Sequence, residues 1–307
     1  MNILITGGLG HIGSQLIRQL PLNYKIKVVD NLLTQRYCSL FDLDNPIIFS
    51  NKDINQISIE DLEKADIVIH LAAITNAEGS FENKKETEKI NTELTSNFID
   101  KCEQAGCKFL FPSSTSVYGM ATDIVYEDDD TFLNPQSPYA ETKINIEKKL
   151  KNYKNDYVIL RFGTIFGSSV GMRFHTAINK FCYEASIGKP LTIWRENFDQ
   201  YRPYLGLNDA IRSIIFFLMT KKVWNETYNV LTDNFKLCDI VDYIQTNTGI
   251  TVDMVNTPLL NQFSYKVSDE KIKALGFKPE DDLFKSIDNT LYKLRNLVDQ
   301  QIVETNE

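Results

Sequence analysis

Two side chains suited to proton transfer, Tyr139 and Lys143, lie four positions apart at the start of a helix that the sequence predicts from Ser137 to about Leu150. Residues at this spacing share one face of a helix. An ammonium group near a phenol favours the phenolate and lowers the pKa of the tyrosine from its usual value of about 10. Such a tyrosine can exchange a proton with a substrate hydroxyl near neutral pH. For an isolated pair, the alternative is an ordinary amphipathic helix face.

Polar side chains also follow a predicted buried strand, Lys108 to Phe111, where the chain continues Pro-Ser-Ser-Thr-Ser-Val-Tyr-Gly over residues 112–119. In open α/β sheets, ligands bind outside the carboxyl ends of the strands. These serines are therefore expected at a ligand site. An amphipathic helix face alone would not explain them.

A third signal is the glycine turn over Thr6 to Gly13, which lies between the apolar run 2–5 and a predicted helix, Ile12 to Leu20. Such a turn lets the backbone approach a pyrophosphate, and the helix N-terminus points unpaired N–H groups at it. A second strand, Lys25 to Val29, ends at Asp30, where a carboxylate would bond a ribose 2′-hydroxyl and repel a 2′-phosphate. The sequence thus predicts NAD rather than NADP. The alternative is a tight turn in an α/β protein that binds no dinucleotide.

The elements that must position these residues alternate between strands and helices in the first half of the chain. The clearest helical pattern runs from Lys84 to Ala105, and such alternation predicts a parallel sheet covered on both faces. The further predicted strands are Ile47 to Ser50, Asp66 to Leu71 and Tyr157 to Arg161. The second half is less regular, with helices at Met172 to Gly188 and Asn208 to Thr220, an extended run at Pro190 to Trp194, a strand at Thr227 to Leu231, and two helical patterns between Ser268 and Val298.

Composition narrows the possible partners. The chain has 307 residues, of which 43% are hydrophobic, and a net charge of −8, so nucleic acid or an anionic membrane is not expected as the main partner. No apolar stretch reaches the length of a membrane span, and no basic-then-apolar leader begins the chain, so a cytoplasmic location is expected. The five cysteines and the scattered residues His11, His70 and His175 form no ligand pattern, so no metal site is predicted.

Together the motifs resemble the extended short-chain dehydrogenase/reductase family, and within it the NAD-dependent nucleotide-sugar epimerase/dehydratase branch typified by UDP-glucose 4-epimerase. The resemblance covers nearly the whole chain. It implies an α/β fold with a Rossmann-type doubly wound parallel sheet and a smaller mixed α/β C-terminal substrate domain. The expected boundaries are residues 1–168 for the NAD-binding domain, with 204–231 returning to it, and residues 169–307 mainly for nucleotide-sugar binding.

The resemblance also assigns site residues. It implies that Tyr139 and Lys143 are catalytic and that Ser114, four positions before Tyr118, is the catalytic serine. Lys143 would also bond the nicotinamide ribose. The cofactor residues expected from the matching motifs are Gly7, Gly10, His11, Ile12, Gly13, Asp30, Asn31, Asp53, Ile54, Leu71, Ala72, Ala73, Tyr139 and Lys143. The substrate residues expected are Thr164, Arg173, Asn179, Trp194 and Arg202. Simple packing is an alternative for His11 and Trp194, and a solvated position is an alternative for Arg173.

Two departures from the family pattern bear on the reaction. A 4,6-dehydratase of this branch carries Asp-Glu after its catalytic Thr, where this chain has Thr115 and Ser116. Epimerases commonly have Asn at the position of Thr164. The first difference argues against water elimination, because neither hydroxyl can act as the required acid or base.

The resemblance therefore implies a nucleotide-sugar 4-epimerase, which removes a hydride from the sugar C4 and returns it to the opposite face of a 4-keto intermediate. One alternative is a net oxidoreductase on the same substrates, either a C4 dehydrogenase or a 4-keto reductase. A less favoured alternative is a non-catalytic dinucleotide sensor, since such proteins typically lose the Tyr or the Lys. The family also implies a homodimer formed through the helices at Lys84 to Ala105 and Pro138 to Tyr153.

Overall fold

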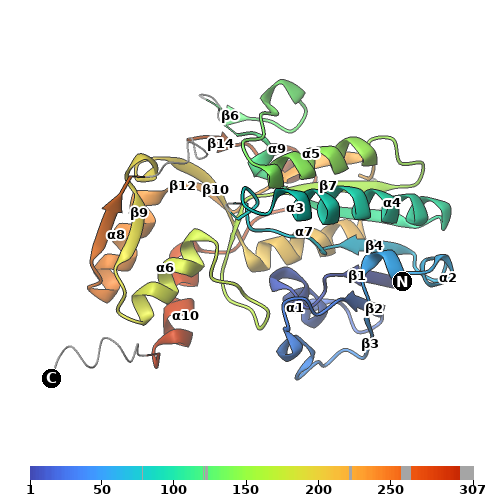
Figure 1. The fold of residues 1–307 in the computed structure, drawn as a ribbon, viewed down its shortest axis with the longest axis horizontal. Helices are drawn as coiled ribbons and strands as arrows, with labels where there is room; N and C mark the ends of the chain where they lie inside the picture. Colours follow the sequence, from blue (N-terminus) through green and yellow to red (C-terminus); the bar gives the residue numbers. More distant parts are fainter. Residues whose placement is uncertain (78, 120, 122–123, 221–222, 257–263, 298–307) are drawn as a thin grey trace.

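The fold is a seven-stranded parallel sheet with helices on both faces, beside a second region built from small sheets and helices (Figure 1). The computed structural model describes the whole chain except residues 78, 120, 122–123, 221–222, 257–263 and 298–307. The sheet has the strand order β11-β7-β5-β4-β1-β2-β3. Its strands are β1 Asn2–Thr6, β2 Lys25–Asp30, β3 Ile47–Asn51, β4 Ile67–His70, β5 Lys108–Ser114, β7 Tyr157–Phe162 and β11 Glu226–Val230.

Alternation along β1 shows how the sheet buries both faces. Ile3 and Ile5 point into a core shared with α1 (His11–Gln19) and α7 (Leu207–Met219). Leu4 points into the opposite core, shared with α4 (Thr95–Gln104) and α5 (Pro138–Leu150). The strand order reverses between β1 and β4, and in doubly wound sheets a ligand crevice opens at that point.

The second region has its own core, in which Phe166, Ile193 and Ile240 are buried. Its three-stranded sheet is β12-β10-β8, and β13 pairs with β9. A further strand pair, β14 with β6, lies near the end of α5 in Figure 1. The remaining strands are β6 Ile124–Val125, β8 Thr164–Phe166, β9 Leu191–Trp194, β10 Tyr201–Gly206, β12 Asp233–Lys236, β13 Val252–Val255 and β14 Lys266–Val267. The remaining helices are α2 Ile59–Leu62, α3 Lys84–Glu88, α6 Ala177–Ser186, α8 Leu237–Thr248, α9 Glu270–Ala274 and α10 Leu283–Leu294.

A buried carboxylate ties α7 to the tail of the chain. Asp209 is fully buried, and it accepts backbone N–H groups from Glu280 at 2.8 Å and Asp281 at 3.0 Å. It also accepts the hydroxyl of Thr232 at 2.6 Å and an N–H of Arg212. A buried carboxylate needs such a set of donors, because leaving it unpaired is costly. The tail is therefore part of the packing of α7.

Two predicted helices differ from the structure. The pattern at Lys84 to Ala105 gives α3, a π-helical stretch over Lys89–Leu94, and α4. The pattern at Met172 to Gly188 gives a helix only from Ala177, because Thr176 has an extended backbone and residues before it run along the cavity wall described below. Both differences arise where tertiary packing overrides a local 3.6-residue pattern.

Candidate active site

Two adjoining cavities open at the carboxyl ends of the central strands, with volumes of about 400 and about 110 Å³. Gly7, Gly10, Leu71, Ala73 and Arg173 line both of them. The larger cavity also contains the predicted residues His11, Ile12, Gly13, Ser114, Tyr139, Lys143, Thr164, Trp194 and Arg202. The smaller cavity contains Asp30, Asn31, Asp53, Ile54 and Ala72. The structure thus brings together residues from distant parts of the sequence.

The glycine turn has the close geometry that a dinucleotide requires. Gly7 has φ +65°, and a Cβ there would lie 2.6 Å from the backbone N of Ala72. Gly10 is the N-cap of α1 and no side chain caps that helix end. The first-turn N–H groups of α1 therefore face the cavity uncapped, as a bound pyrophosphate would need. These residues fit NAD.

The smaller cavity matches the adenosine end of such a cofactor. Asp30 ends β2, and its carboxylate accepts the backbone N–H of Leu9 at 3.1 Å and of Leu32 at 2.9 Å. The carboxylate thereby joins the second strand to the glycine turn and still lines the cavity. Asp53 caps the short turn that begins at Ile54. The Asn31 side chain donates to Asp53 at 3.1 Å. A ribose hydroxyl or an adenine edge is suited to these polar groups.

The catalytic candidates come from two adjacent elements. Ser114 ends β5, and Tyr139 and Lys143 lie on one face of α5, which begins with Ser137 as its N-cap and Pro138 in its first turn. The Ser137 hydroxyl accepts the backbone N–H of Ala140 at 3.2 Å. The cap and the proline fix where α5 starts, and hence which residues face the strand end.

Burial governs the pKa of the tyrosine in this structure. The Tyr139 pKa is raised to about 12, chiefly by burial, while the Ser114 hydroxyl bonded to it and the cation of Arg173 act in the opposite direction. The expected lowering by Lys143 is not observed. The lysine Nζ lies 5.7 Å from the centre of the tyrosine ring and donates to the Pro112 carbonyl at 2.8 Å. Sequence spacing placed both groups on one face but could not give that distance.

Lys143 is itself buried, with 6% of its surface exposed, and burial lowers its pKa to about 8. The nearby carboxylate of Glu147 opposes this shift. The ammonium also lies 4.5 Å from the centre of the Phe111 ring. A lysine in such surroundings titrates close to physiological pH.

On the opposite side of the larger cavity lie the predicted substrate residues. Thr164 begins β8, Trp194 ends β9 and Arg202 belongs to β10. Arg202 donates to Gln200 at 3.1 Å and its guanidinium lies 5.8 Å from the Tyr265 ring. Within the described part of the chain, no carboxylate lies within 4.0 Å of Arg202. An unpaired guanidinium facing a cavity is suited to a phosphate group.

Arg173 stands where the two cavities meet. It donates to Thr75 at 2.5 Å, and its buried Nε has no hydrogen-bond partner among the described residues. Burial lowers its pKa, and the neighbouring cation of Arg36 adds to that effect. A cation so placed is suited to an anion of either the cofactor or the substrate.

Asn179 is placed elsewhere. Its carboxamide is fully buried and bonds the backbone N–H of Gly167 at 3.2 Å and the carbonyl of the same residue at 3.1 Å. Both ends of the amide are therefore used within α6 and the strand turn before it. His11 combines two roles, since it lines the larger cavity while its Nδ1 pairs with Ser169 at 2.7 Å.

Several cavity residues escaped sequence analysis. Arg36 lies in the loop after β2, where Leu32 and Gln35 have positive φ, and it lines the smaller cavity. His175 and Tyr265 line the larger one. Arg36 carried a usable signal, because it is a basic residue shortly after the predicted ribose acid. The other two carried none, because only the packing of irregular segments brings them to the site.

Two further findings concern the described residues. No group of three or more His, Cys, Asp or Glu side chains there could hold a metal ion. No helix in that same part of the chain is both long and apolar enough to cross a membrane.

Comparison with known proteins identifies a family and several relatives that this chain resembles. Residues 3–230 match the NAD dependent epimerase/dehydratase family. YtcB of Bacillus subtilis, an uncharacterized UDP-glucose epimerase, is 30% identical over 256 residues, which cover 75% of this chain and 76% of that protein. The Arabidopsis thaliana trifunctional protein RHM3, a UDP-glucose 4,6-dehydratase with epimerase and reductase activities, is 30% identical over 90% of this chain. This chain spans only 44% of RHM3.

A solved structure of an epimerase also matches this chain over nearly its whole length. The UDP-glucuronic acid 4-epimerase of Bacillus cereus, in complex with UDP-glucuronic acid and NAD, is 26% identical and superposes with a TM-score of 0.87. The alignment covers 96% of this chain and 99% of that one. With the glycine cradle and the residues at the strand ends, these matches show that the protein is an enzyme that uses NAD and belongs to the NAD dependent epimerase/dehydratase family.

Proposed function

We propose that the protein is an NAD-dependent nucleotide-sugar 4-epimerase. The observation that carries this proposal is the meeting of Ser114, Tyr139 and Lys143 at one cavity that Arg173 and Arg202 also line. The first group can move a proton at a sugar hydroxyl, and the second can hold a diphosphate. Relatives named as UDP-glucose and UDP-glucuronic acid epimerases support a UDP-sugar as the substrate.

In this mechanism each residue has one task. NAD, when bound, supplies the reversible acceptance of hydride from the sugar C4. The Tyr139 oxygen, as phenolate, takes the proton of the C4 hydroxyl and later returns it. Ser114 donates to the same sugar oxygen and orients it. Ser114 and the Arg173 cation favour the phenolate, and Lys143 adds positive charge 5.7 Å from the centre of the ring. The 4-keto sugar then turns within the cavity while the arginines retain its diphosphate.

The choice of epimerisation over dehydration rests on the two residues after Ser114. Thr115 and Ser116 both line the cavity, and because both side chains are hydroxyls neither supplies a carboxyl group to the substrate. Loss of water between C5 and C6 needs an acid and a base at that place. The neutral hydroxyls of Thr115 and Ser116 cannot act as that acid and base.

The experiment is incubation of the NAD-loaded protein with UDP-glucose or UDP-glucuronic acid. Proton NMR should show the C4 epimer, without net accumulation of NADH. NADH that builds up in proportion to substrate would instead identify a dehydrogenase. With dTDP-glucose, mass spectrometry should show no loss of water. Retained NAD with no turnover of any nucleotide sugar would favour a non-catalytic sensor.

We also propose a homodimer, on the strength of the family resemblance. The outer faces of α3, α4 and α5 carry charged residues such as Glu88, Asp100 and Lys148, and none of the exposed large apolar side chains described lies on these helices. A dimer through this face would therefore be held largely by polar contacts. Light scattering at micromolar concentration tests it, since a mass near 35.3 kDa would indicate a monomer.

A further inference from the structure

In the part of the chain that the structure describes, Glu147 is the acid that acts on Lys143, and the two do not form an ion pair. Among the described residues no carboxylate lies within 4.0 Å of its Nζ, which bonds only the Pro112 carbonyl. Glu147, one turn further along α5, is the acid that influences it. From β4, His70 also lies within electrostatic range of the ammonium, but burial lowers the His70 pKa to about 3, so the imidazole is neutral.

The Glu147 carboxylate is fixed by hydrogen bonds from Arg161 and Ser113. It is 2% exposed, and it pairs with Arg161 of β7, which is 0% exposed, through an NH2–Oε2 contact of 2.6 Å and two contacts from Nε at 3.2 Å. The Ser113 hydroxyl donates to Oε1 at 2.5 Å. Since Ser113 precedes Ser114, the carboxylate connects the helix of the tyrosine and lysine to the strand end of the serine.

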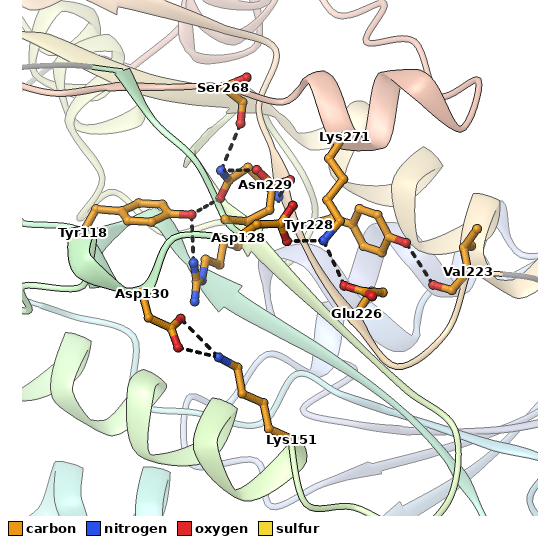
Figure 2. A network of polar contacts seen from close by, with 12 residues as sticks. Tyr118, Asp128, Asp130, Lys151, Val223, Glu226, Tyr228, Asn229, Ser268 and Lys271 are labelled. Carbon is orange, nitrogen blue, oxygen red and sulfur yellow. Dashed lines mark hydrogen bonds and ion pairs between the residues drawn. The ribbon is translucent and has the colours of Figure 1, made fainter.

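The network continues beyond the arginine. Arg161 donates to the Tyr118 hydroxyl at 2.9 Å, and Tyr118 donates to Asn229 at 2.6 Å. Asn229 in turn donates to Glu127 at 3.0 Å and to the Ser268 carbonyl at 2.9 Å. Figure 2 shows Tyr118, Asn229 and Ser268 along this chain of contacts, next to the ion pairs of Lys271. Arg161 is thereby fixed from both ends.

The charges of the group nearest the site do not cancel. Lys143 and Arg161 are cations and Glu147 is an anion, while Ser113 and Tyr118 are neutral. Burial with too little compensating negative charge favours loss of a proton from the weaker cation, which is Lys143. Without Glu147 the lysine would face only neutral dipoles and the cation of Arg161.

We propose that Glu147 is a positioning residue that keeps Lys143 protonated over the working pH range and fixes the end of β5 against α5. The proposal rests on the role of Tyr139 and Lys143 in the proposed function. The proposal gives a function to the buried Glu147–Arg161 ion pair, which lines neither cavity.

The test uses Glu147→Gln, which keeps the size and one acceptor but removes the charge. Because this leaves Arg161 unpaired, a second variant, Glu147→Gln with Arg161→Met, removes both charges and so avoids a buried guanidinium without a partner. Glu147→Asp retains the charge. Glu141→Gln is the matched control, since Glu141 is an exposed acid on the same helix.

The first readout is independent of catalysis. Acetic anhydride labels neutral amines, and peptide mass spectrometry gives the pH midpoint for labelling of Lys143. In Glu147→Gln the midpoint should fall by about one pH unit, the order expected for losing a charge several ångströms away in a protein interior. In the double variant the fall should be smaller, because loss of the Arg161 cation offsets part of the lost negative charge. Glu141→Gln and Glu147→Asp should keep the wild-type midpoint.

The second readout is the pH profile of kcat/KM for the epimerisation. The alkaline limb, which reports loss of the Lys143 proton, should move to lower pH in Glu147→Gln and by less in the double variant, in step with the labelling midpoints. A uniform loss of activity at every pH, with an unchanged labelling midpoint, would show that the pair serves folding only and would overturn the proposal. A shifted midpoint in a protein that turns over no nucleotide sugar would overturn the proposed function and leave the role of Glu147 standing.

Discussion

The two walls of the larger cavity are built in different ways. On the catalytic wall, Lys143 is buried and donates to the Pro112 carbonyl, and the Glu147–Arg161 pair behind it is also buried and hydrogen-bonded. On the substrate wall, Arg202 and Trp194 are half-buried, come from short strands, and have few partners among the described residues. Buried, fully bonded groups hold one geometry, whereas half-exposed ones can adapt. The comparison indicates a rigid site for the proposed proton transfer and an adaptable one for the proposed sugar substrate.

Of the changes that test this comparison, Tyr139→Phe should have the largest effect on activity. The change removes the proton carrier with little change in volume, so kcat should fall by two or more orders of magnitude, roughly the range for a lost general base. Thermal stability and NAD binding should stay close to wild type. Tyr126→Phe alters an exposed tyrosine and serves as the control. Near-normal turnover in Tyr139→Phe would remove the tyrosine from the mechanism.

A smaller effect of another kind is expected from Arg202→Met. If this side chain holds the diphosphate, its loss costs a charge-assisted hydrogen bond of about 1.5–3 kcal/mol, so KM for the nucleotide sugar should rise about 10–100-fold. The value of kcat should change little. Arg195→Met, an exposed arginine just after β9, is the matched control. A fall in kcat with unchanged KM would contradict the assignment of substrate binding to one wall and proton transfer to the other.

The smallest expected change concerns cofactor choice at Asp30. Asp30→Asn keeps an acceptor for only one of the backbone N–H groups of Leu9 and Leu32, which bond separate oxygens of the carboxylate, and it removes the charge that repels a 2′-phosphate. The preference for NAD over NADP should narrow by about tenfold, on the order of one lost like-charge repulsion. Titration of both cofactors into stripped protein measures it. Tighter binding of NADP by the wild type would contradict the assignment of Asp30.

The same contrast explains what the sequence could predict. The glycine turn, Asp30 and the Tyr139–Lys143 pair lie on regular elements or directly after them, so periodicity and spacing were enough to place them. The parallel sheet follows from the alternation of elements in the first half of the chain, whereas the place of β11 beside β7 comes from the structure. The family match and the solved structure confirm the predicted Rossmann-type fold and NAD as the cofactor.

The substrate wall was predictable only in part. Arg173, Arg202, Trp194 and Thr164 do line the cavity, but Asn179 packs against Gly167, and Tyr265 went unnoticed. These residues lie on short strands or irregular segments whose packing has no local sequence signal. The tyrosine pKa was also beyond sequence reasoning, because burial depends on the whole cavity and not on the four-residue spacing to Lys143.

The hydrogen bonds of the Asp209 carboxylate have a consequence for how the chain folds during synthesis. Two of its donors, Arg212 and Thr232, are close to it in sequence, but the other two are the backbone N–H groups of residues 280 and 281. During synthesis, α7 therefore carries an under-bonded buried charge until the tail has left the ribosome. The cofactor sheet can form early, but it matures only with the C-terminal segment. Shortened versions that end before residue 280 should then be substrates for cellular proteases rather than usable dinucleotide-binding domains.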